Sequence, residues 1–316
     1  MKNVALIGCG RISNRHIEAI EAHPNLRVAV ACDVQMDRAQ AVAQRTGARP
    51  TTDMLDIAEA DIVSILTPSG MHPRHAIAVA EGTHVPNIVV EKPIALTVRE
   101  SLELFHRVEG AGKRLLPVYQ NRYNPLVAYI RDLVKSGALG RVHHFICDVL
   151  WNRNDAYFAI DWHGTRDLDG GVLYTQASHY VDMLHFLFGE IDEYSGVGGN
   201  LRQLEVHDSV AAAMKFKNGT VGTLNATVDA FGGNLATELT LIAEKGNIRL
   251  SGTNLNEIVL WNVEGMEKPH LDFKLDHQYG KGHNTLYEHI VNENWDAFPS
   301  KEDVFSGIRL MERLSY

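Results

Sequence analysis

The chain has 316 residues, of which 45% are hydrophobic and 22% charged, and its formal net charge is −9 at pH 7. A hydrophobic core stops growing at roughly 250–300 residues, so this length predicts two domains. The negative charge argues against nucleic acid as a partner, which requires a basic surface. No apolar run approaches the roughly 18 residues that cross a bilayer. The N-terminus lacks a signal-peptide pattern, so we expect a cytoplasmic protein that does not contact membranes.

Residues 1–119 alternate between buried strands and helices. Strands are expected at residues 3–10, 26–33, 60–68, 87–93 and 114–121, and helices between them at 13–22, 36–47, 72–82 and 97–112. Strands that alternate with helices of this length predict a parallel, doubly wound α/β sheet.

The pattern changes in residues 120–316, which we assign to a second, α+β domain. Helices are expected at 124–140, 170–188 and 301–316, a strand at 142–152, and successive strands from Asp192 to about Leu275. Asn218–Gly219, between two alternating segments, is a strong hairpin signal. The sheet of this domain should therefore be mostly antiparallel, with one face available to a partner.

The segment GCGRIS, residues 8–13, follows the first strand and begins a helix. Gly8 permits a tight turn, and Gly10 lets the backbone approach a pyrophosphate that also meets the helix N-terminus. Asp33 ends the second strand, where a carboxylate accepts hydrogen bonds from the adenosine ribose and repels a 2′-phosphate. The first domain is therefore predicted to bind NAD rather than NADP.

Two further segments end core strands at the edge of the sheet where ligands bind. They are TPSGMH, residues 67–72, and EKP, residues 91–93. The proline after Lys92 favours an extended backbone, so the ammonium group can project towards a bound ring. The expected cofactor-binding residues are Gly8, Gly10, Arg11, Ile12, Asp33, Thr67, Pro68, Ser69, His72, Glu91, Lys92 and Gln120.

The helix predicted around residues 170–188 combines an apolar stripe with Thr175, His179 and Asp182 on its opposite side. His179 is either a solvated or hydrogen-bonded residue, or a proton acceptor that lines a cleft. The ordinary pKa of histidine suits a base near neutral pH. The chain has no H-E-x-x-H or C-x-x-C pattern, so no metal site is expected.

Together these segments resemble the Gfo/Idh/MocA family, which includes glucose-fructose oxidoreductase and inositol dehydrogenase. GCGRIS, Asp33, TPSGMH, EKP and residues 170–182 occur in the family's order and span essentially the whole chain. The resemblance implies a Rossmann domain followed by a domain with a large open sheet that commonly forms homodimers or homotetramers. It also implies NAD-dependent chemistry at a sugar carbon, with Lys92 and His179 as the catalytic residues.

One position departs from the inositol dehydrogenases, which carry aspartate one helical turn before the histidine, where this chain has Thr175. Residues 120–125, 150–171 and 175–184 are instead similar to members that act on nucleotide sugars. This similarity implies oxidation of the 3-hydroxyl of UDP-N-acetylglucosamine to a 3-keto sugar that an aminotransferase consumes, as in the 2,3-diamino sugars of lipid A. The expected substrate-binding residues are Asn121, Arg122, Tyr123, Asn124, Arg153, Tyr157, His163, Arg166, Thr175 and His179.

Three alternatives remain open at this point. The substrate could be UDP-N-acetylglucosaminuronate, whose C6 carboxylate needs a cationic or hydroxyl partner. It could be a free sugar or cyclitol, which needs no residues for a diphosphate. The chain could also be an NAD-binding sensor without turnover, although Lys92 and His179 argue against this.

Overall fold

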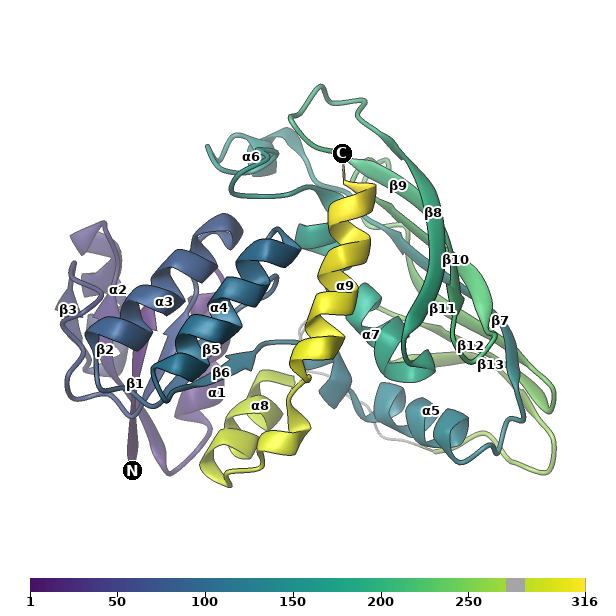
Figure 1. Cartoon of the computed structure of the whole chain (residues 1–316), viewed down its shortest axis with the longest axis horizontal. Helices are drawn as coiled ribbons and strands as arrows, with labels where there is room; N and C mark the ends of the chain where they lie inside the picture. Colours follow the sequence, from purple (N-terminus) through teal and green to yellow (C-terminus); the bar gives the residue numbers. More distant parts are fainter. Residues whose placement is uncertain (271–281, 316) are drawn as a thin grey trace. The chain divides into compact units, whose positions relative to one another are not determined.

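The computed structural model describes residues 1–270 and 282–315 (Figure 1). The chain forms two compact units, one of Met1–Tyr119 with Lys281–Lys301 and one of Gln120–Gly280 with Glu302–Tyr316. The sequence analysis assigned every residue after 119 to the second domain. In the structure, the segment Lys281–Lys301 belongs to the first unit instead.

The first unit contains a parallel six-stranded sheet in the order β3-β2-β1-β4-β5-β6. Its strands are β1 (Lys2–Ile7), β2 (Leu26–Cys32), β3 (Arg49–Thr51), β4 (Ile62–Ile65), β5 (Asn87–Val90) and β6 (Arg114–Pro117). All residues of β4 and β5 are buried, which explains their uninterrupted apolar character. The predicted doubly wound sheet is confirmed, and β3 is a short edge strand that the sequence analysis did not identify.

Five α-helices of the first unit are described. They are α1 (Ser13–Glu21), α2 (Met36–Thr46), α3 (His72–Gly82), α4 (Val98–Gly110) and α8 (Gly282–Val291). Helix α4 begins with a capping box, in which Thr97 and Glu100 each bond the other's backbone. Helix α3 packs against α4, and α8 packs against α1. The contact of α8 with α1 attaches the returning segment to this unit.

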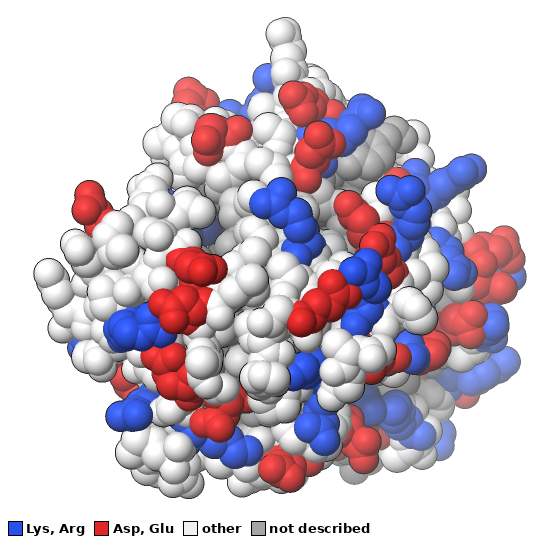
Figure 2. All heavy atoms as spheres, turned by 60° about the vertical axis from the view of Figure 1, so that its left-hand side comes forward, with Lys and Arg blue, Asp and Glu red and all other residues white. Residues whose placement is uncertain are grey.

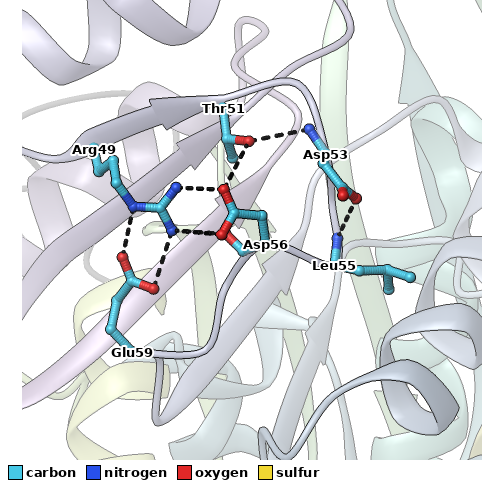
Figure 3. A network of polar contacts seen from close by, with 6 residues as sticks. All are labelled: Arg49, Thr51, Asp53, Leu55, Asp56 and Glu59. Atoms are coloured by element: carbon cyan, nitrogen blue, oxygen red, sulfur yellow. Dashed lines mark hydrogen bonds and ion pairs between the residues drawn. The ribbon is translucent and has the colours of Figure 1, made fainter.

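A network of side chains holds the loop that follows the edge strand β3 (Figure 3). Arg49 donates to Asp56 at 2.6 Å and to Glu59 at 2.9 Å. Thr51 lies within hydrogen-bond distance of Asp56 and accepts from the backbone of Asp53. The Arg49 side chain is 41% exposed, so these ion pairs order the loop more than they stabilise the fold.

The second unit contains a seven-stranded sheet in the order β13-β12-β11-β7-β10-β9-β8. Its strands are β7 (Val142–Leu150), β8 (Ile191–Gly199), β9 (Ser209–Phe216), β10 (Val221–Thr227), β11 (Ala236–Ala243), β12 (Gly246–Ser251) and β13 (Glu257–Val263). Only the β7–β10 pair is parallel among these pairings, which confirms the mostly antiparallel sheet. The predicted hairpin at Asn218–Gly219 joins β9 to β10. Residues 271–275, where a strand was also expected, lie outside the described residues.

The helices of the second unit lie on one side of this sheet (Figure 1). They include α5 (Pro125–Lys135), α7 (Ser178–Phe188) and α9 (Lys301–Leu314), and a short helix α6 (Asp155–Phe158) precedes α7 in the chain. Phe188 of α7 packs against Phe145 and Phe216 of the sheet, with ring centroids 5.3 Å apart in both pairs. Burial alternates along β7, where Phe145 and Cys147 are buried and Ile146 is exposed. The sheet thus has one packed face and one open face, and assembly through the open face stays a prediction.

Surface charge is mixed on the face drawn in Figure 2, where Lys and Arg side chains lie among Asp and Glu side chains. Exposed ion pairs of the first unit include Arg45 with Glu21 and Arg107 with Glu81. The face in Figure 2 therefore carries no continuous basic patch of the kind that nucleic acid requires. None of the helices in the described part of the chain is long and apolar enough to cross a membrane.

Candidate active site

All the residues predicted to bind the cofactor except Gln120, which follows β6, come after four neighbouring strands of the first unit. Asp33 follows β2, Gly8 and Gly10 follow β1, Thr67 follows β4 and Lys92 follows β5. These strands are parallel and adjacent in the order β2-β1-β4-β5, so their carboxyl ends meet at one edge of the sheet. This is the edge at which ligands bind in open α/β sheets.

The glycine loop has the geometry that a dinucleotide requires. Gly8 has a φ of +100°, and a Cβ atom there would lie 2.7 Å from the carbonyl oxygen of Leu66. A Cβ atom at Gly10 would meet nothing within 4 Å, which leaves room for a phosphate group beside the backbone. The carboxylate of Asp33 accepts from the backbone N–H groups of Cys9 and Gln35, at 2.8 and 2.9 Å. It is therefore fixed beside the loop with lone pairs left for ribose hydroxyls, and the residues present fit NAD.

His72 connects the two segments that follow β4 and β5. Its Nε2 lies 2.7 Å from the carbonyl oxygen of Thr67, and its Nδ1 lies 2.7 Å from that of Pro93. The ring is 1% exposed, and burial lowers its pKa although the two carbonyl contacts oppose this shift. The hydroxyl of Thr67 contacts Nδ1 of His75 at 3.0 Å. Direct contact of these side chains with the cofactor stays a prediction.

Lys92 is half-buried, and the Lys92–Pro93 peptide bond is cis. Its backbone N–H donates to the carboxylate of Glu91, which is 4% exposed. That carboxylate also accepts from His16 at 3.0 Å and from His283 at 3.2 Å. By residue type, His16, Glu91 and His283 could hold a metal ion. The sequence analysis identified neither histidine, because His16 had no motif around it and α8 was not predicted.

The helix that carries His179 begins differently from the prediction. Residues Leu173–Ala177 form a π-helical turn, and α7 starts at Ser178. Such turns occur frequently at functional sites. His179 is 7% exposed and Asp182 is 5% exposed, so the side opposite the apolar stripe is buried as well. The interpretation of His179 as a residue on a solvated face is therefore wrong.

Three predicted substrate residues of the second unit, Arg153, Tyr157 and His163, belong to one polar cluster. Arg153 donates to Oε1 of Gln176 at 2.5 Å, and the Gln176 amide donates to the hydroxyl of Tyr157 at 3.1 Å. The ring of Tyr157 stacks on that of His163 at 3.8 Å. Thr175 donates to the carbonyl of Gly171 one turn earlier. A small pocket adjoins the cluster, lined by residues that include Tyr157, Asp169, Gly171, Thr175, Gln176 and His207.

His163 has a carboxylate partner that the sequence analysis did not identify. Its Nδ1 lies 3.2 Å from Oδ2 of Asp169, and Oδ1 of Asp169 accepts from the backbone of Gly171. The Asp169 side chain is 4% exposed. A carboxylate fixed in this way orients the imidazole and selects its tautomer.

The other predicted substrate residues are distributed along the second unit. Arg122 donates twice to Asp182, at 2.7 and 2.8 Å, and once to Asp303 at 3.0 Å. Burial alone would lower its pKa, but these carboxylates raise it. Asn124 caps the N-terminus of α5, and Arg166 is exposed. Burial raises the pKa of Tyr123, and Asn121 is 9% exposed.

Comparison with known proteins gives consistent matches for both units. Residues 2–119 match the oxidoreductase family with an NAD-binding Rossmann fold, and residues 127–249 match the GFO/IDH/MocA C-terminal domain. The WlbA dehydrogenase from Bordetella pertussis, solved with NADH and UDP-GlcNAcA, is 31% identical with a TM-score of 0.89, covering 98% of this chain and 93% of that one. The WlbA enzyme from Chromobacterium violaceum, solved with the same ligands, is also 31% identical with a TM-score of 0.87, covering 100% and 96%.

A curated relative adds a different substrate to the comparison. Levoglucosan dehydrogenase from Pseudarthrobacter phenanthrenivorans is 26% identical over 326 aligned positions, covering 90% of this chain and 80% of the relative. The two family matches lie in the order seen in the structure, one in each unit. The glycine loop and Asp33 have the geometry that NAD requires. The chain therefore belongs to the Gfo/Idh/MocA family of oxidoreductases, and its N-terminal domain binds NAD.

Proposed function

We propose that this protein is an NAD-dependent dehydrogenase that oxidises the 3-hydroxyl of a UDP-linked N-acetylglucosamine-type sugar. The observation that carries the proposal is the full-length likeness to two dehydrogenases solved with NADH and UDP-GlcNAcA. It favours UDP-N-acetylglucosaminuronate as the substrate over UDP-N-acetylglucosamine, which the sequence analysis placed first. An aminotransferase would consume the 3-keto product.

The proposed chemistry divides into three tasks. NAD supplies the hydride acceptor when it is bound. Lys92 would hold the substrate hydroxyl and steady the charge that develops on its oxygen. His179 would take the hydroxyl proton, since histidine titrates near neutral pH.

The polar cluster of the second unit supports a role in substrate recognition. Arg153 is held by Gln176, and its guanidinium lies over the ring of Trp151 at 5.0 Å. A guanidinium fixed in this way could bind a diphosphate or a C6 carboxylate in a bidentate manner. Tyr157 offers an aromatic ring beside it. We therefore propose Arg153 and Tyr157 as substrate-binding residues.

The proposal is tested by NADH formation with UDP-N-acetylglucosaminuronate, UDP-N-acetylglucosamine and free inositol, with an aminotransferase present to remove the keto product. We expect turnover with a UDP sugar and none with inositol. Replacing His179 by Asn should lower kcat by about 10²- to 10⁴-fold, the usual contribution of a general base. Replacing His143, an exposed histidine of β7 outside the polar cluster, by Asn is the matched control and should leave kcat nearly unchanged. If neither UDP sugar is oxidised, the proposal is wrong.

A free-sugar dehydrogenase is the second candidate, because the levoglucosan dehydrogenase matches 90% of this chain. A free sugar has no diphosphate, so its oxidation should depend less on Arg153. Levoglucosan therefore belongs in the same assay, with Arg153→Met as the discriminating variant. Turnover of levoglucosan that survives this substitution, together with inactivity towards UDP sugars, would favour the second candidate.

A further inference from the structure

The backbone on both sides of Lys92 is held by buried side chains from distant parts of the first unit. Glu91 precedes Lys92, and its carboxylate contacts His16 on α1 and His283 on α8. Pro93 follows Lys92, and its carbonyl contacts His72 at the start of α3. These contacts join segments that lie up to 192 residues apart in the chain.

On the Glu91 side, both carboxylate oxygens are used. Oε1 lies 3.0 Å from Nε2 of His16 and 3.2 Å from Nε2 of His283, and Oε2 accepts from the backbone N–H of Lys92 at 3.0 Å. Burial would raise the pKa of Glu91, but the bonds from the two histidines hold it well below its usual value. The carboxylate is therefore ionised, and each histidine donates from Nε2.

The protonation of His16 at Nε2 fixes the donor and acceptor roles in the next two hydrogen bonds of the network. Because Nε2 carries the proton, Nδ1 of His16 must accept, and the Tyr287 hydroxyl lies 2.8 Å from it. The hydroxyl of Ser64 lies 2.8 Å from that of Tyr287 and can donate to it in turn. Ser64 is in β4, Tyr287 in α8 and His16 in α1, so the network runs from the sheet through the returning helix α8 to α1.

On the Pro93 side, His72 lies between two carbonyl oxygens. It contacts the carbonyls of Thr67 and Pro93, each at 2.7 Å. A neutral ring can donate to only one of them, and the ring is 1% exposed. His72 thus joins the segments that follow β4 and β5, and it restrains the residue directly after Lys92.

We propose that His16, Glu91, His283 and His72 are positioning residues for Lys92. They fix the backbone from which its side chain projects, and α8 supplies one of them from the distant end of the chain. The proposal rests on the proposed role of Lys92 in the reaction. It also gives the return of Lys281–Lys301 to the first unit a functional reason beyond packing.

The same three residues, His16, Glu91 and His283, offer the two-histidine, one-carboxylate donor set of many metal sites. A metal ion at Nε2 of His16 would replace the proton that bonds Glu91. The hydrogen bonds already account for both nitrogens of His16 and both oxygens of Glu91. Metal content is therefore part of the test.

The first experiment compares three variants in α8. His283→Leu removes the donor to Glu91, whereas His283→Gln can restore an N–H near the position of Nε2. Ile290→Val is the control, because Ile290 is also fully buried in α8 but has no polar atom. A displacement of a reacting group by about 1 Å lowers the rate of the reaction by up to about 10²-fold. We expect a loss of kcat of roughly that size in His283→Leu, partial recovery in His283→Gln, and near-normal kcat in Ile290→Val.

The second readout does not depend on the substrate. Reductive ¹³C-methylation labels the lysine amines for NMR, and Lys92→Arg identifies the Lys92 signal by its loss. We expect His283→Leu to shift the position or the titration of this signal, and expect His283→Gln and Ile290→Val to leave it near that of the unchanged protein. If these shifts occur but no UDP sugar is oxidised, only the proposed function fails.

Three outcomes would overturn the positioning role. The first is a Lys92 signal that is the same in His283→Leu as in the unchanged protein. The second is a loss of kcat in His283→Leu and Ile290→Val that follows only their loss of thermal stability. The third is one equivalent of a transition metal that co-purifies with the protein and is absent from His283→Leu.

Discussion

Among single residues, Asp33 is the one that should decide the choice of cofactor. Its carboxylate accepts from the backbone of Cys9 and Gln35 and is thereby fixed beside the glycine loop. Asp33→Asn removes the charge, and hydrogen bonds to a charged acceptor contribute about 1.5–3 kcal/mol. We expect the Kd for NADH to rise about 10- to 100-fold, and the Kd for NADPH to rise less because a repulsive charge is also lost.

Isothermal titration of both cofactors measures this change. Asp37→Asn is a matched control, since Asp37 is exposed in the first turn of α2. It should leave both affinities nearly unchanged. An unaltered NADH affinity in Asp33→Asn would show that the ribose is held elsewhere.

The sequence predicts cofactor-binding residues such as Gly8 and Asp33, because their roles depend on the backbone conformation of a short segment. Gly8 must adopt a positive φ next to Leu66, and Asp33 must end the strand beside it, so spacing alone identifies both. His16 and His283 lack such a local requirement. They contact Glu91 from 75 and 192 residues away, and only the folded chain brings them together.

At the level of elements, the ion pairs of Arg122 join the turn after β6 to two helices. Arg122 follows β6, whereas Asp182 is in α7 and Asp303 in α9. Arg122→Met would leave the buried carboxylate of Asp182 without its cation. Breaking a buried pair in this way costs about 3–5 kcal/mol, and we expect the free energy of unfolding to fall by that amount.

Guanidinium denaturation measures the loss, and Arg49→Met provides the comparison. Arg49 also contacts two carboxylates (Figure 3), but its side chain is 41% exposed. Exposed pairs contribute about 0–1 kcal/mol, so this variant should remain close to the unchanged protein. Equal losses in the two variants would mean that burial does not govern the contribution of Arg122.

Periodicity predicted most of these elements but not their local distortions. The apolar stripe around Val181 predicted a helix, and α7 is there. The π-helical turn Leu173–Ala177 leaves no signal in a hydrophobic pattern, because that pattern records which residues are buried and not which backbone bonds they make. The sequence left open whether His179 is solvated or lines a cleft, because polar residues on a helix ordinarily face water, and only the fold shows that its side chain is buried.

At the level of the whole molecule, each structural unit is built from two separate segments of the chain. The first unit ends at Tyr119 and is completed by the segment Lys281–Lys301. Sequence reasoning assigns domains as contiguous stretches, since a composition change marks where one pattern ends. Helix α8 has an apolar side, but that side does not specify that α1 is its partner.

The histidines of the first unit predict an acid-sensitive fold. Burial lowers the pKa of His16 and of His72, and it lowers the pKa of His75 to about 4. In the unfolded chain these rings titrate near about 6.5, so below that pH the unfolded chain binds more protons than the folded one. Stability is therefore full above about pH 6.5 and is lost as the pH falls towards the folded values. The free energy of unfolding should therefore be lower at pH 5.5 than at pH 7.5, and His75 alone should contribute about 1 kcal/mol of this difference.

The His75→Gln variant separates this effect from all other titrating groups. The substitution removes one histidine whose pKa is lowered in the folded state. The difference in unfolding free energy between pH 7.5 and pH 5.5 should therefore shrink by up to about 1 kcal/mol. His23→Gln is the control, because His23 follows α1 and lies outside the buried set. Denaturation of the three proteins at both pH values gives the comparison. A difference that is the same in His75→Gln as in the unchanged protein would mean that His75 titrates alike in the folded and unfolded states.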